Sequence, residues 1–377
     1  MSQDSRPTVL PVFKMVDVDR GVQEIRNDPD PDLNLDDPEL LAQEAAIETE
    51  SLGRRFLEPK TILSFIFAIA VIAFTFRSLN IDLGEVWGYV KKVNLGWFAL
   101  AALTFYSSFL VRAFRWRGML HRSGISPDHG YDLPGIPGIL KILLLSWFAN
   151  CVVPAKLGDA FRGYLLKERT RASFGVSMGT ILAERLMDLV VLVFILLASG
   201  LVVFGTHIPQ RAELAFAFGA GTVALGVVGV LVLWFMRERV EAWLPERFTL
   251  HFQKLSSGIF HSLRNPAPMI GLTCAVWLLD GVRIFLMARS LGFDLATAEA
   301  LLVSLSSALV TVIPFTPGGL GLVDGFMIWI LGQVGLAENA AAAITFVDRL
   351  VSYWSLILVG LPLYLVHLRH SMVRTER

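Results

Sequence analysis

Long apolar blocks separated by short polar stretches constrain this fold more than any other feature of the sequence. A run of about 20 apolar residues is long enough to cross the ~30 Å hydrocarbon core of a bilayer as a helix. Such blocks recur along the chain, and the longest is Phe174–Phe204. The composition agrees, because 54% of the residues are hydrophobic and 18% are charged, against about 25% charged residues in soluble proteins. The sequence therefore predicts an all-α polytopic membrane protein.

Six blocks are predicted to cross the membrane completely. They are Thr61–Phe76, Leu95–Phe114, Phe174–Phe204, Glu213–Phe235, Pro268–Leu291 and Ala340–His367. Basic residues are enriched on the cytoplasmic side of a membrane. Arg54 and Arg55 precede the first span, and Arg369 and Arg374 follow the last. Both termini are therefore predicted to be cytoplasmic, in a multi-pass protein of the cytoplasmic (inner) membrane.

Two further apolar stretches are interrupted by proline and glycine. Ile139–Val153 is too short to cross the bilayer at ~1.5 Å per residue; it ends at Pro154 and is followed by the amphipathic Leu157–Arg169. Ala298–Ile313 and Leu320–Val334 flank a second proline- and glycine-rich break. Short apolar segments of this kind are typical of re-entrant helices. We predict about six transmembrane helices plus two broken re-entrant helical hairpins, or eight spans if each hairpin crosses fully.

The polar regions define the ends of the predicted domain. Residues 1–60 are rich in acids and prolines and are predicted to form a mostly disordered cytoplasmic tail. The transmembrane domain then covers residues 61–367, and residues 368–377 form a second cytoplasmic tail. Within the domain, residues 237–266 carry apolar side chains at helical spacing. This segment is predicted to be an amphipathic helix on the cytoplasmic membrane surface or a small soluble helical loop.

The two broken stretches resemble each other. The pattern Pro-x-x-Leu-Gly begins at Pro154 and again at Pro317, and an acid-Arg-Leu motif follows 31 residues later at Arg185 and 32 residues later at Arg349. In the predicted topology the first hairpin enters from the cytoplasm and the second from outside. The sequence therefore predicts an inverted repeat, which is the architecture of many secondary transporters.

Charged residues inside these spans are the candidate site, because each costs roughly 2.5–3.5 kcal/mol at the centre of a bilayer. The candidate substrate-binding residues are Lys156, Asp159, Arg162, Glu184, Arg185, Asp188, Gly318, Gly319, Gly321, Asp324, Asp348 and Arg349. The alternative is that the charges form a buried ion-pair network that only sets helix register. The glycines could likewise serve tight helix packing alone.

Spacing predicts how some of these charges pair. Arg185 and Asp188 are three residues apart on a helix, as are Asp280 and Arg283. Glu184 and Asp188 are like charges four residues apart, so they need a nearby cation, for which Arg185 and Arg349 are candidates. Arg112 and Arg115 are interpreted as topology anchors or lipid headgroup contacts, and Trp116 as an interfacial anchor.

The site chemistry favours an anionic ligand. Helix N-termini inside a membrane present free N–H groups and the positive end of a dipole. Glycines at the second break allow close approach of the backbone to a ligand. Two such ends and two arginines would suit a lipid phosphate, because the planar guanidinium matches phosphate geometry.

Other function classes lack their motifs. The sequence contains no Walker-type phosphate loop, no His-Glu-x-x-His and no Gly-x-Ser-x-Gly. We therefore predict no catalytic residues, no metal site and no cofactor. Cys151 and Cys274 have no metal-ligand spacing. The balanced net charge gives no sign of a nucleic-acid partner, and the sequence carries no signal for an oligomeric state.

Three stretches together resemble the lysylphosphatidylglycerol synthase transmembrane family, also called flippase-like proteins. They are NCVVPAKLGDAFR (Asn150–Arg162), ERLMD (Glu184–Asp188) and PFTPGGLG (Pro314–Gly321), and the resemblance covers about Thr61 to His367. In two-part members this membrane domain flips an aminoacylated lipid that a separate cytoplasmic domain makes. The family often has a glutamate in the second hairpin, where this sequence has Asp324.

The resemblance implies a stand-alone flippase-like protein, because no synthase domain follows the last predicted span. We therefore expect a lipid translocator whose partners are membrane lipids. Two alternatives remain open. The protein could be an accessory subunit of a lipid-modifying enzyme, such as a glycosyltransferase or synthase, or it could transport a small soluble anion.

Overall fold

The computed structural model describes residues 59–79, 81–153, 157–205, 246–311 and 316–375, with residues 221, 224 and 228 in addition. Within these ranges the regular structure is helical and contains no strand, as predicted for the fold class. Nearly all of the predicted acidic tail, Lys156 and most of the span predicted over Glu213–Phe235 lie outside the described residues.

The helices follow the predicted apolar blocks closely, and α8 coincides with the predicted span Phe174–Phe204. The α-helices are α3 (Pro59–Ser78), α4 (Leu83–Val90), α5 (Leu95–Arg122), α6 (Ile136–Val152), α7 (Gly158–Thr170), α8 (Phe174–Phe204), α10 (Glu246–Leu263), α11 (Ala267–Ser290), α12 (Thr297–Val310), α13 (Leu322–Gln333), α14 (Glu338–Arg349) and α15 (Ser355–Thr375). Short 3₁₀ turns lie at Pro127–His129 and Pro317–Gly319, and a π-helical turn, Leu350–Trp354, joins α14 to α15.

Polar residues fix where two of the helices begin. Asp82 caps α4 by accepting a hydrogen bond from the Gly84 N–H at 2.7 Å. Asn94 caps α5 by accepting from the Gly96 N–H at 3.0 Å. These side chains satisfy backbone donors that have no partner within the first helical turn. The two capping residues therefore define where α4 and α5 begin.

Among the described residues, four helices are long and apolar enough to cross a membrane. They are Leu95–His129, Phe174–Phe204, Ala267–Ser290 and Glu338–Arg369, and a fifth arises if the bent pair Phe65–Ser78 and Leu83–Val90 is one span. The shorter apolar helices α6 and α12 are the two stretches for which the sequence predicts re-entrant helices.

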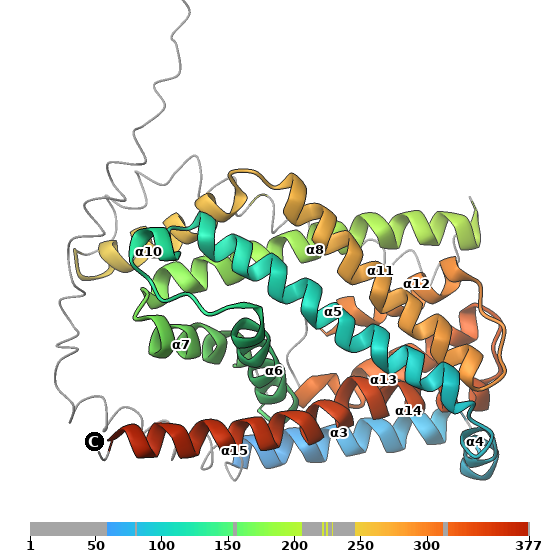
Figure 1. Ribbon diagram of the computed structural model, residues 1–377. Coiled ribbons are helices and arrows are strands. Elements are labelled where there is room, and N and C mark those ends of the chain that lie inside the picture. Colours follow the sequence, from blue (N-terminus) through green and yellow to red (C-terminus); the bar gives the residue numbers. More distant parts are fainter. Residues whose placement is uncertain are drawn as a thin grey trace, which may run out of the picture.

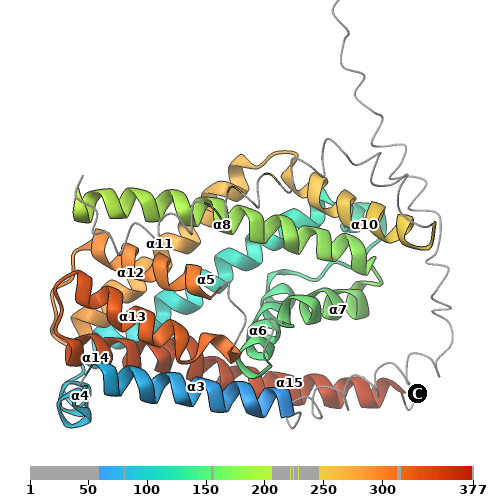
Figure 2. The ribbon, with the colours of Figure 1, turned by 180° about the vertical axis from the view of Figure 1, so that it is seen from behind.

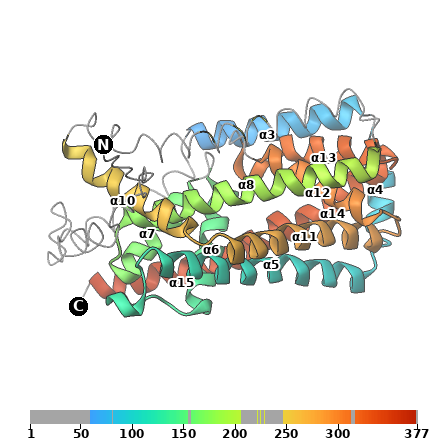
Figure 3. The ribbon, with the colours of Figure 1, turned by 90° about the horizontal axis from the view of Figure 1, so that it is seen from above.

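Two of the long helices, α5 and α11, run side by side and antiparallel, on the side of the bundle opposite α3 in Figure 3 (Figures 1 and 3). The Asn94 N–H at the start of α5 donates to the Ser290 carbonyl at the end of α11, at 2.7 Å. At the opposite end, Arg122 of α5 donates to the Asn265 carbonyl before α11, at 2.6 Å. The two helices are therefore in contact along their whole shared length and point in opposite directions.

The two hairpins, α6–α7 and α12–α13, lie in opposite halves of the molecule (Figures 1 and 2). The Tyr353 hydroxyl donates to the Cys151 carbonyl at 2.8 Å and links the end of α6 to the π-helical turn. Gly318, at the second break, has a φ of 57°, and a Cβ added there would lie 3.7 Å from the Cys151 Cα. The end of α6 and the turn Pro317–Gly319 therefore meet next to the π-helical turn that follows α14.

The helix α10 lies along α8 with main chains almost in contact. A Cβ added to Gly179 of α8 would lie 2.2 Å from the Leu255 carbonyl oxygen, and one added to Gly258 of α10 would lie 2.3 Å from the Val176 carbonyl oxygen. Glycine at both positions permits this approach. The helical periodicity predicted within residues 237–266 is thus present in the part that the structure describes, and its apolar face is packed on α8.

Candidate functional site

A cavity of about 250 Å³ lies where the two hairpin breaks meet α5, α11 and α14; we call it the central cavity. Its wall mixes aromatic and aliphatic side chains with serines and many charged groups. The charged residues that line it are Arg112, Asp159, Arg185, Asp280, Arg283, Asp348 and Arg349. Four guanidinium groups therefore line one partly open cavity inside the membrane domain.

Six arginines and six carboxylates in and around the cavity form three groups of ion pairs, which we together call the arginine–carboxylate network. Its arginines are Arg112, Arg115, Arg162, Arg185, Arg283 and Arg349, and its acids are Asp159, Glu184, Asp188, Asp280, Asp324 and Asp348. The positive and negative charges of these residues are equal in number, so the network is neutral. Neutral pairing is what allows charges to be buried this deeply.

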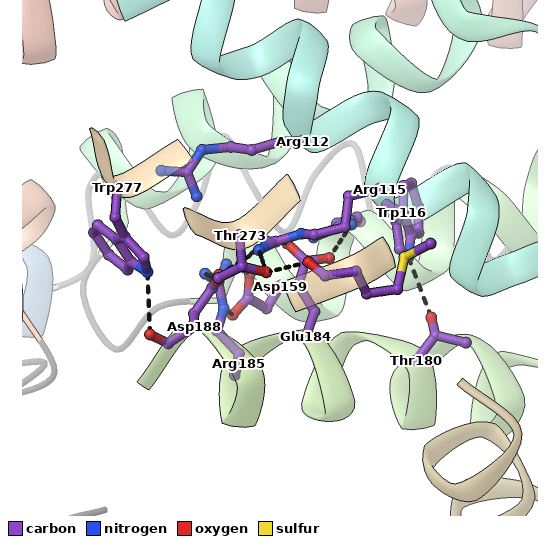
Figure 4. Close-up of polar contacts among 12 residues, drawn as sticks. Arg112, Arg115, Trp116, Asp159, Thr180, Glu184, Arg185, Asp188, Thr273 and Trp277 are labelled. Atoms are coloured by element: carbon purple, nitrogen blue, oxygen red, sulfur yellow. Dashed lines mark hydrogen bonds and ion pairs between the residues drawn. The ribbon is translucent and has the colours of Figure 1, made fainter. Parts of the chain in front are cut away.

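Glu184 and Asp188 of α8 are held by an arginine from α5. The Arg115 side chain is fully buried, and it donates to Asp188 Oδ1 at 2.5 Å and to Glu184 Oε1 at 2.8 Å (Figure 4). It also donates to the Thr273 hydroxyl of α11 at 2.7 Å. Arg162 of α7 occupies the second oxygen of Glu184 at 2.6 Å. One buried carboxylate thus joins α5, α7 and α8.

The first hairpin is tied to α8 by a two-pronged ion pair. Arg185 donates from Nε to Asp159 Oδ2 at 2.9 Å and from Nη2 to Asp159 Oδ1 at 2.7 Å. Asp188 lies 3.5 Å from the same guanidinium, as the spacing predicts. The Arg185 side chain is 37% exposed, more than any other arginine of the network. It is therefore the guanidinium that a ligand reaches most easily.

The second hairpin is tied to α14 in the same way. Arg349 pairs with Asp324 and donates to the Gly318 carbonyl at 3.2 Å. Asp324 also accepts a hydrogen bond from the Gly321 N–H at 2.7 Å and so caps α13. Asp348, the neighbour of Arg349, pairs with Arg283 of α11. A π-helical turn follows Arg349 directly, and such turns are frequent at functional sites.

Arg112 lies between these two sets of pairs. Its guanidinium is 3.2 Å from Asp280 on the antiparallel helix α11. The guanidinium carbon lies 5.0 Å from the centre of the Trp147 ring and 5.8 Å from that of Trp277, both within cation–π range. Asp280 is also 3.8 Å from Arg283, the predicted pairing on α11. Arg112 is therefore linked through Asp280 to Arg283, which pairs with Asp348 of α14.

The structure brings most predicted site residues together. Asp159, Arg185, Gly318, Gly319, Asp348 and Arg349 line the central cavity. Asp188 and Asp324 do not line it but pair with Arg185 and Arg349, and Arg162 and Glu184 pair with each other next to this group. Gly321 is different, since a Cβ added there would lie 2.6 Å from the Ala68 carbonyl oxygen of α3. Its role is close packing, which is the alternative that the sequence left open.

Some sequence-based assignments were wrong. The cation that separates Glu184 from Asp188 comes chiefly from Arg115, whereas Arg349 pairs in the other half. Arg115 and Trp116 are fully buried instead of anchoring α5 at an interface. Trp116 stacks on Arg162 at 3.7 Å and donates to the Thr180 hydroxyl at 3.1 Å. Spacing gave no hint of these partners, because they lie on other helices.

The described residues hold no group of three or more His, Cys, Asp or Glu side chains arranged to bind a metal ion. Each carboxylate of the network is instead directed at a guanidinium. Arginine has hydrogen-bond donors and no acceptor. These guanidinium groups can therefore bind an anion if oxygen atoms of the anion replace the carboxylate oxygens as acceptors.

Comparison with known proteins places the chain in one family. The family described as the lysylphosphatidylglycerol synthase TM region matches residues 61–360. This chain therefore belongs to that family of membrane proteins, as its motifs indicated.

Curated relatives are similar over much of their length. A UPF0104 membrane protein of Methanocaldococcus jannaschii is 32% identical over 58% of this chain and 94% of its own. A UPF0104 membrane protein of Methanothermobacter thermautotrophicus is 24% identical over 79% of this chain and 93% of its own. The Haloferax volcanii protein named glycosyltransferase AglD is 26% identical over 75% of this chain, but over only 51% of its own length.

Proposed function

We propose that this protein is a lipid translocator that moves a lipid with an anionic phosphate headgroup across the cytoplasmic membrane. The observation that carries the proposal is the central cavity, which is lined by both Arg185 of α8 and Arg349 of α14. Guanidinium groups bind phosphate oxygens in pairs of parallel hydrogen bonds. An intramembrane charge cluster around a cavity is a functional site by default.

The proposal includes an inverted repeat, supported by matching ion pairs. Asp159 and Arg185 are 26 residues apart, and Asp324 and Arg349 are 25 apart. One residue before each arginine is an acid that pairs with an arginine of the long antiparallel helices, Glu184 with Arg115 and Asp348 with Arg283. The same pattern of paired charges around both hairpins supports the proposal of a repeat. Rocking of two such halves about a fixed site is a general mechanism of transport.

The dimensions of the cavity suit a headgroup and not a whole lipid. Its volume of about 250 Å³ lies just below the ~300–1,000 Å³ of sites that enclose drug-sized ligands. The lipid tails would remain in the bilayer beside apolar side chains on the outside of the bundle. Phe74, Phe194 and Leu358 are each more than 70% exposed and provide such a surface.

The remaining features follow from the same proposal. The chain would cross the membrane six times with both termini in the cytoplasm, and each hairpin would enter from one side without crossing. It would not be an enzyme, because the charged groups of the cavity are engaged with each other as ion pairs, and no nucleophile paired with a base was predicted. Carboxylates of the network are the groups through which an ion gradient would act.

A second candidate is an accessory role beside a lipid-headgroup glycosyltransferase. It is favoured by one observation, the relative named glycosyltransferase AglD, about half of whose length this chain matches. In that case the central cavity would hold the headgroup of the lipid that the transferase uses. Both functions require the same binding site, so they differ in whether the purified chain moves lipid unaided.

The experiment that tests the proposal is mass spectrometry of lipids that co-purify with the protein. The variant carries Arg185→Lys and Arg349→Lys, which keep the charge but lose the planar fork. Arg289→Gln is the control, because Arg289 is 45% exposed and pairs with the exposed Asp294. One anionic lipid enriched with the wild type and the control, and depleted in the double variant, supports the proposal. Identical bulk lipids with all three proteins would contradict it and favour transport of a small soluble anion.

A further inference from the structure

Of the six arginines of the network, Arg112 lies farthest from its nearest carboxylate. The shortest N–O distances are 2.5 Å for Arg115, 2.6 Å for Arg162 and 2.7 Å for Arg185, against 3.2 Å for Arg112. This contact uses only Nη2. The Arg112 guanidinium is therefore the one in the network that gives up its carboxylate at the smallest cost.

Arg112 also keeps a buried donor without a partner. Its side chain is 5% exposed and lines the central cavity. Its Nε has no hydrogen-bond acceptor within the described residues, as is also true of Arg115, Arg162 and Arg283, but of these four only Arg112 and Arg283 line the cavity. A buried N–H that lacks an acceptor is costly and requires an explanation. Nε and Nη2 lie on one edge of the guanidinium and can donate two parallel hydrogen bonds; we call this edge the fork. In the described part of the structure Nε has no acceptor, and Nη2 donates to Asp280 at 3.2 Å.

Two indole rings hold this fork in place. Trp147 of α6 and Trp277 of α11 both lie within cation–π distance of the guanidinium. Stacked aromatic rings stabilise the charge of an arginine and leave its edge available for hydrogen bonds. Figure 4 shows the Arg112 guanidinium on the side of the cluster toward Trp277, apart from Arg115 and its two acids. The rings thus hold the Arg112 guanidinium in position while one of its hydrogen-bond donors stays without an acceptor among the residues that the structure describes.

Arg112 shares the central cavity with the arginines of both halves. The guanidinium groups of Arg185, Arg283 and Arg349 line the same cavity. Arg112 and Arg283 are both within 4 Å of Asp280, at 3.2 Å and 3.8 Å. An anion held by Arg112 is therefore in one space with an arginine of each hairpin region.

We propose that Arg112 is the central binding residue for a phosphate group that passes through the cavity, with Asp280 as the carboxylate that the phosphate displaces. This inference rests on the proposed function. Two phosphate oxygens would accept from Nε and Nη2 in parallel. Asp280 is not left alone when it is displaced, because Arg283 lies 3.8 Å away. The exchange therefore leaves every charge with a partner.

The inference predicts that substitutions at the two members of one ion pair change phosphate binding in opposite directions. Arg112→Gln removes the fork and weakens phosphate binding, whereas Asp280→Asn removes the competing carboxylate and strengthens it. A purely structural pair would behave differently, because loss of either partner would impair the protein in the same direction. Arg112→Lys retains the charge without the fork and is expected to rescue only partly.

The test uses the full chain in phosphatidylcholine vesicles that contain a small fraction of fluorescent phosphatidylglycerol, with dithionite quenching as the measure of translocation. A second set of the same vesicles receives radioactive inorganic phosphate. The control is Arg117→Gln on the same helix, since Arg117 does not line the cavity and donates to the Pro134 carbonyl. Gel filtration in detergent checks that each variant is folded.

We expect Arg112→Gln to lower the translocation rate about tenfold or more, the range for loss of charge-assisted hydrogen bonds, and Asp280→Asn to raise apparent affinity. This gain in apparent affinity is expected to be absent from the double variant that carries both Arg112→Gln and Asp280→Asn. If the wild type moves lipid and folded Arg112→Gln matches it, or if the gain persists in the double variant, the inference is wrong and the proposed function stands. Uptake of inorganic phosphate alone, with the same dependence on Arg112, upholds the inference and refutes lipid as the ligand. A wild type that handles neither probe overturns both.

Discussion

Replacement of Glu184 by glutamine tests how strongly the buried network stabilises the bundle. Glu184 is 1% exposed and accepts from Arg115 at 2.8 Å and from Arg162 at 2.6 Å. Glutamine is nearly isosteric but neutral, so both guanidinium groups lose a buried counter-charge. Removal of one partner from a buried ion pair costs about 3–5 kcal/mol, and here one carboxylate serves two arginines on two further helices.

The matched control has the same chemistry at the surface. Arg289 and Asp294 are 2.5 Å apart, but the Asp294 side chain is 84% exposed. Surface pairs contribute only about 0–1 kcal/mol, so Asp294→Asn is expected to leave stability almost unchanged. The comparison separates the effect of burial on stability from the effect of contact distance, because Glu184 and Asp294 make contacts of similar length.

The assay is thermal unfolding in detergent followed by intrinsic fluorescence. At about 2 °C per kcal/mol for a chain of this size, Glu184→Gln should lower the midpoint by roughly 6–10 °C relative to wild type. Asp294→Asn should shift it by less than about 2 °C. If the two variants unfold within a degree of each other, the network does not stabilise the bundle in the way that its burial implies, and the reasoning is refuted.

Three further variants probe other contacts. Gly258→Ala should separate α10 from α8 and lower the unfolding midpoint, because its Cβ would lie 2.3 Å from a main-chain carbonyl oxygen of α8. The control Gly271→Ala should be neutral or slightly stabilising, because a Cβ there would have nothing within 4 Å. Equal unfolding midpoints for these two variants would contradict the prediction. Asp324→Asn should cost more stability than Asp294→Asn in the same assay, because it weakens the cap of α13 and leaves Arg349 without its carboxylate. Tyr353→Phe should cost about 0.5–1.5 kcal/mol by removing the hydroxyl that donates to the end of α6; a stability equal to wild type would show that the two breaks are held together by other contacts.

The sequence predicts helices well here because membrane spans are defined by local composition. The bounds of α8 equal the predicted Phe174–Phe204, and the shortness of α6 and α12 follows from the proline- and glycine-containing breaks after them. The local pairs are also predictable, since Arg185 and Asp188 are three residues apart and lie 3.5 Å apart in space. Periodicity and spacing carry this information within a single helix.

Partners on other helices are not predictable in this way. Arg115 lies 69 residues from Glu184 and 73 from Asp188, so no local spacing connects them. It looked like an anchor because it stands near other arginines at the end of a predicted span. The spacing of Arg112 and Arg115 places both on one face of α5, and that face turns inward in the structure. Only packing of α5 against α8 and α11 decides this.

Neutrality of the network has a consequence for how tightly any anion binds. Each arginine of the cavity already has a carboxylate partner, so a phosphate gains only the difference between its own hydrogen bonds and those that it replaces. The exchange is easiest at Arg185, which is the most exposed, and at Arg112, where the contact is longest. Each site in a conduction path must bind strongly enough for the ligand to enter and weakly enough for it to leave. Carboxylates that compete at every arginine provide such a balance, because each one returns to its guanidinium as the anion moves on.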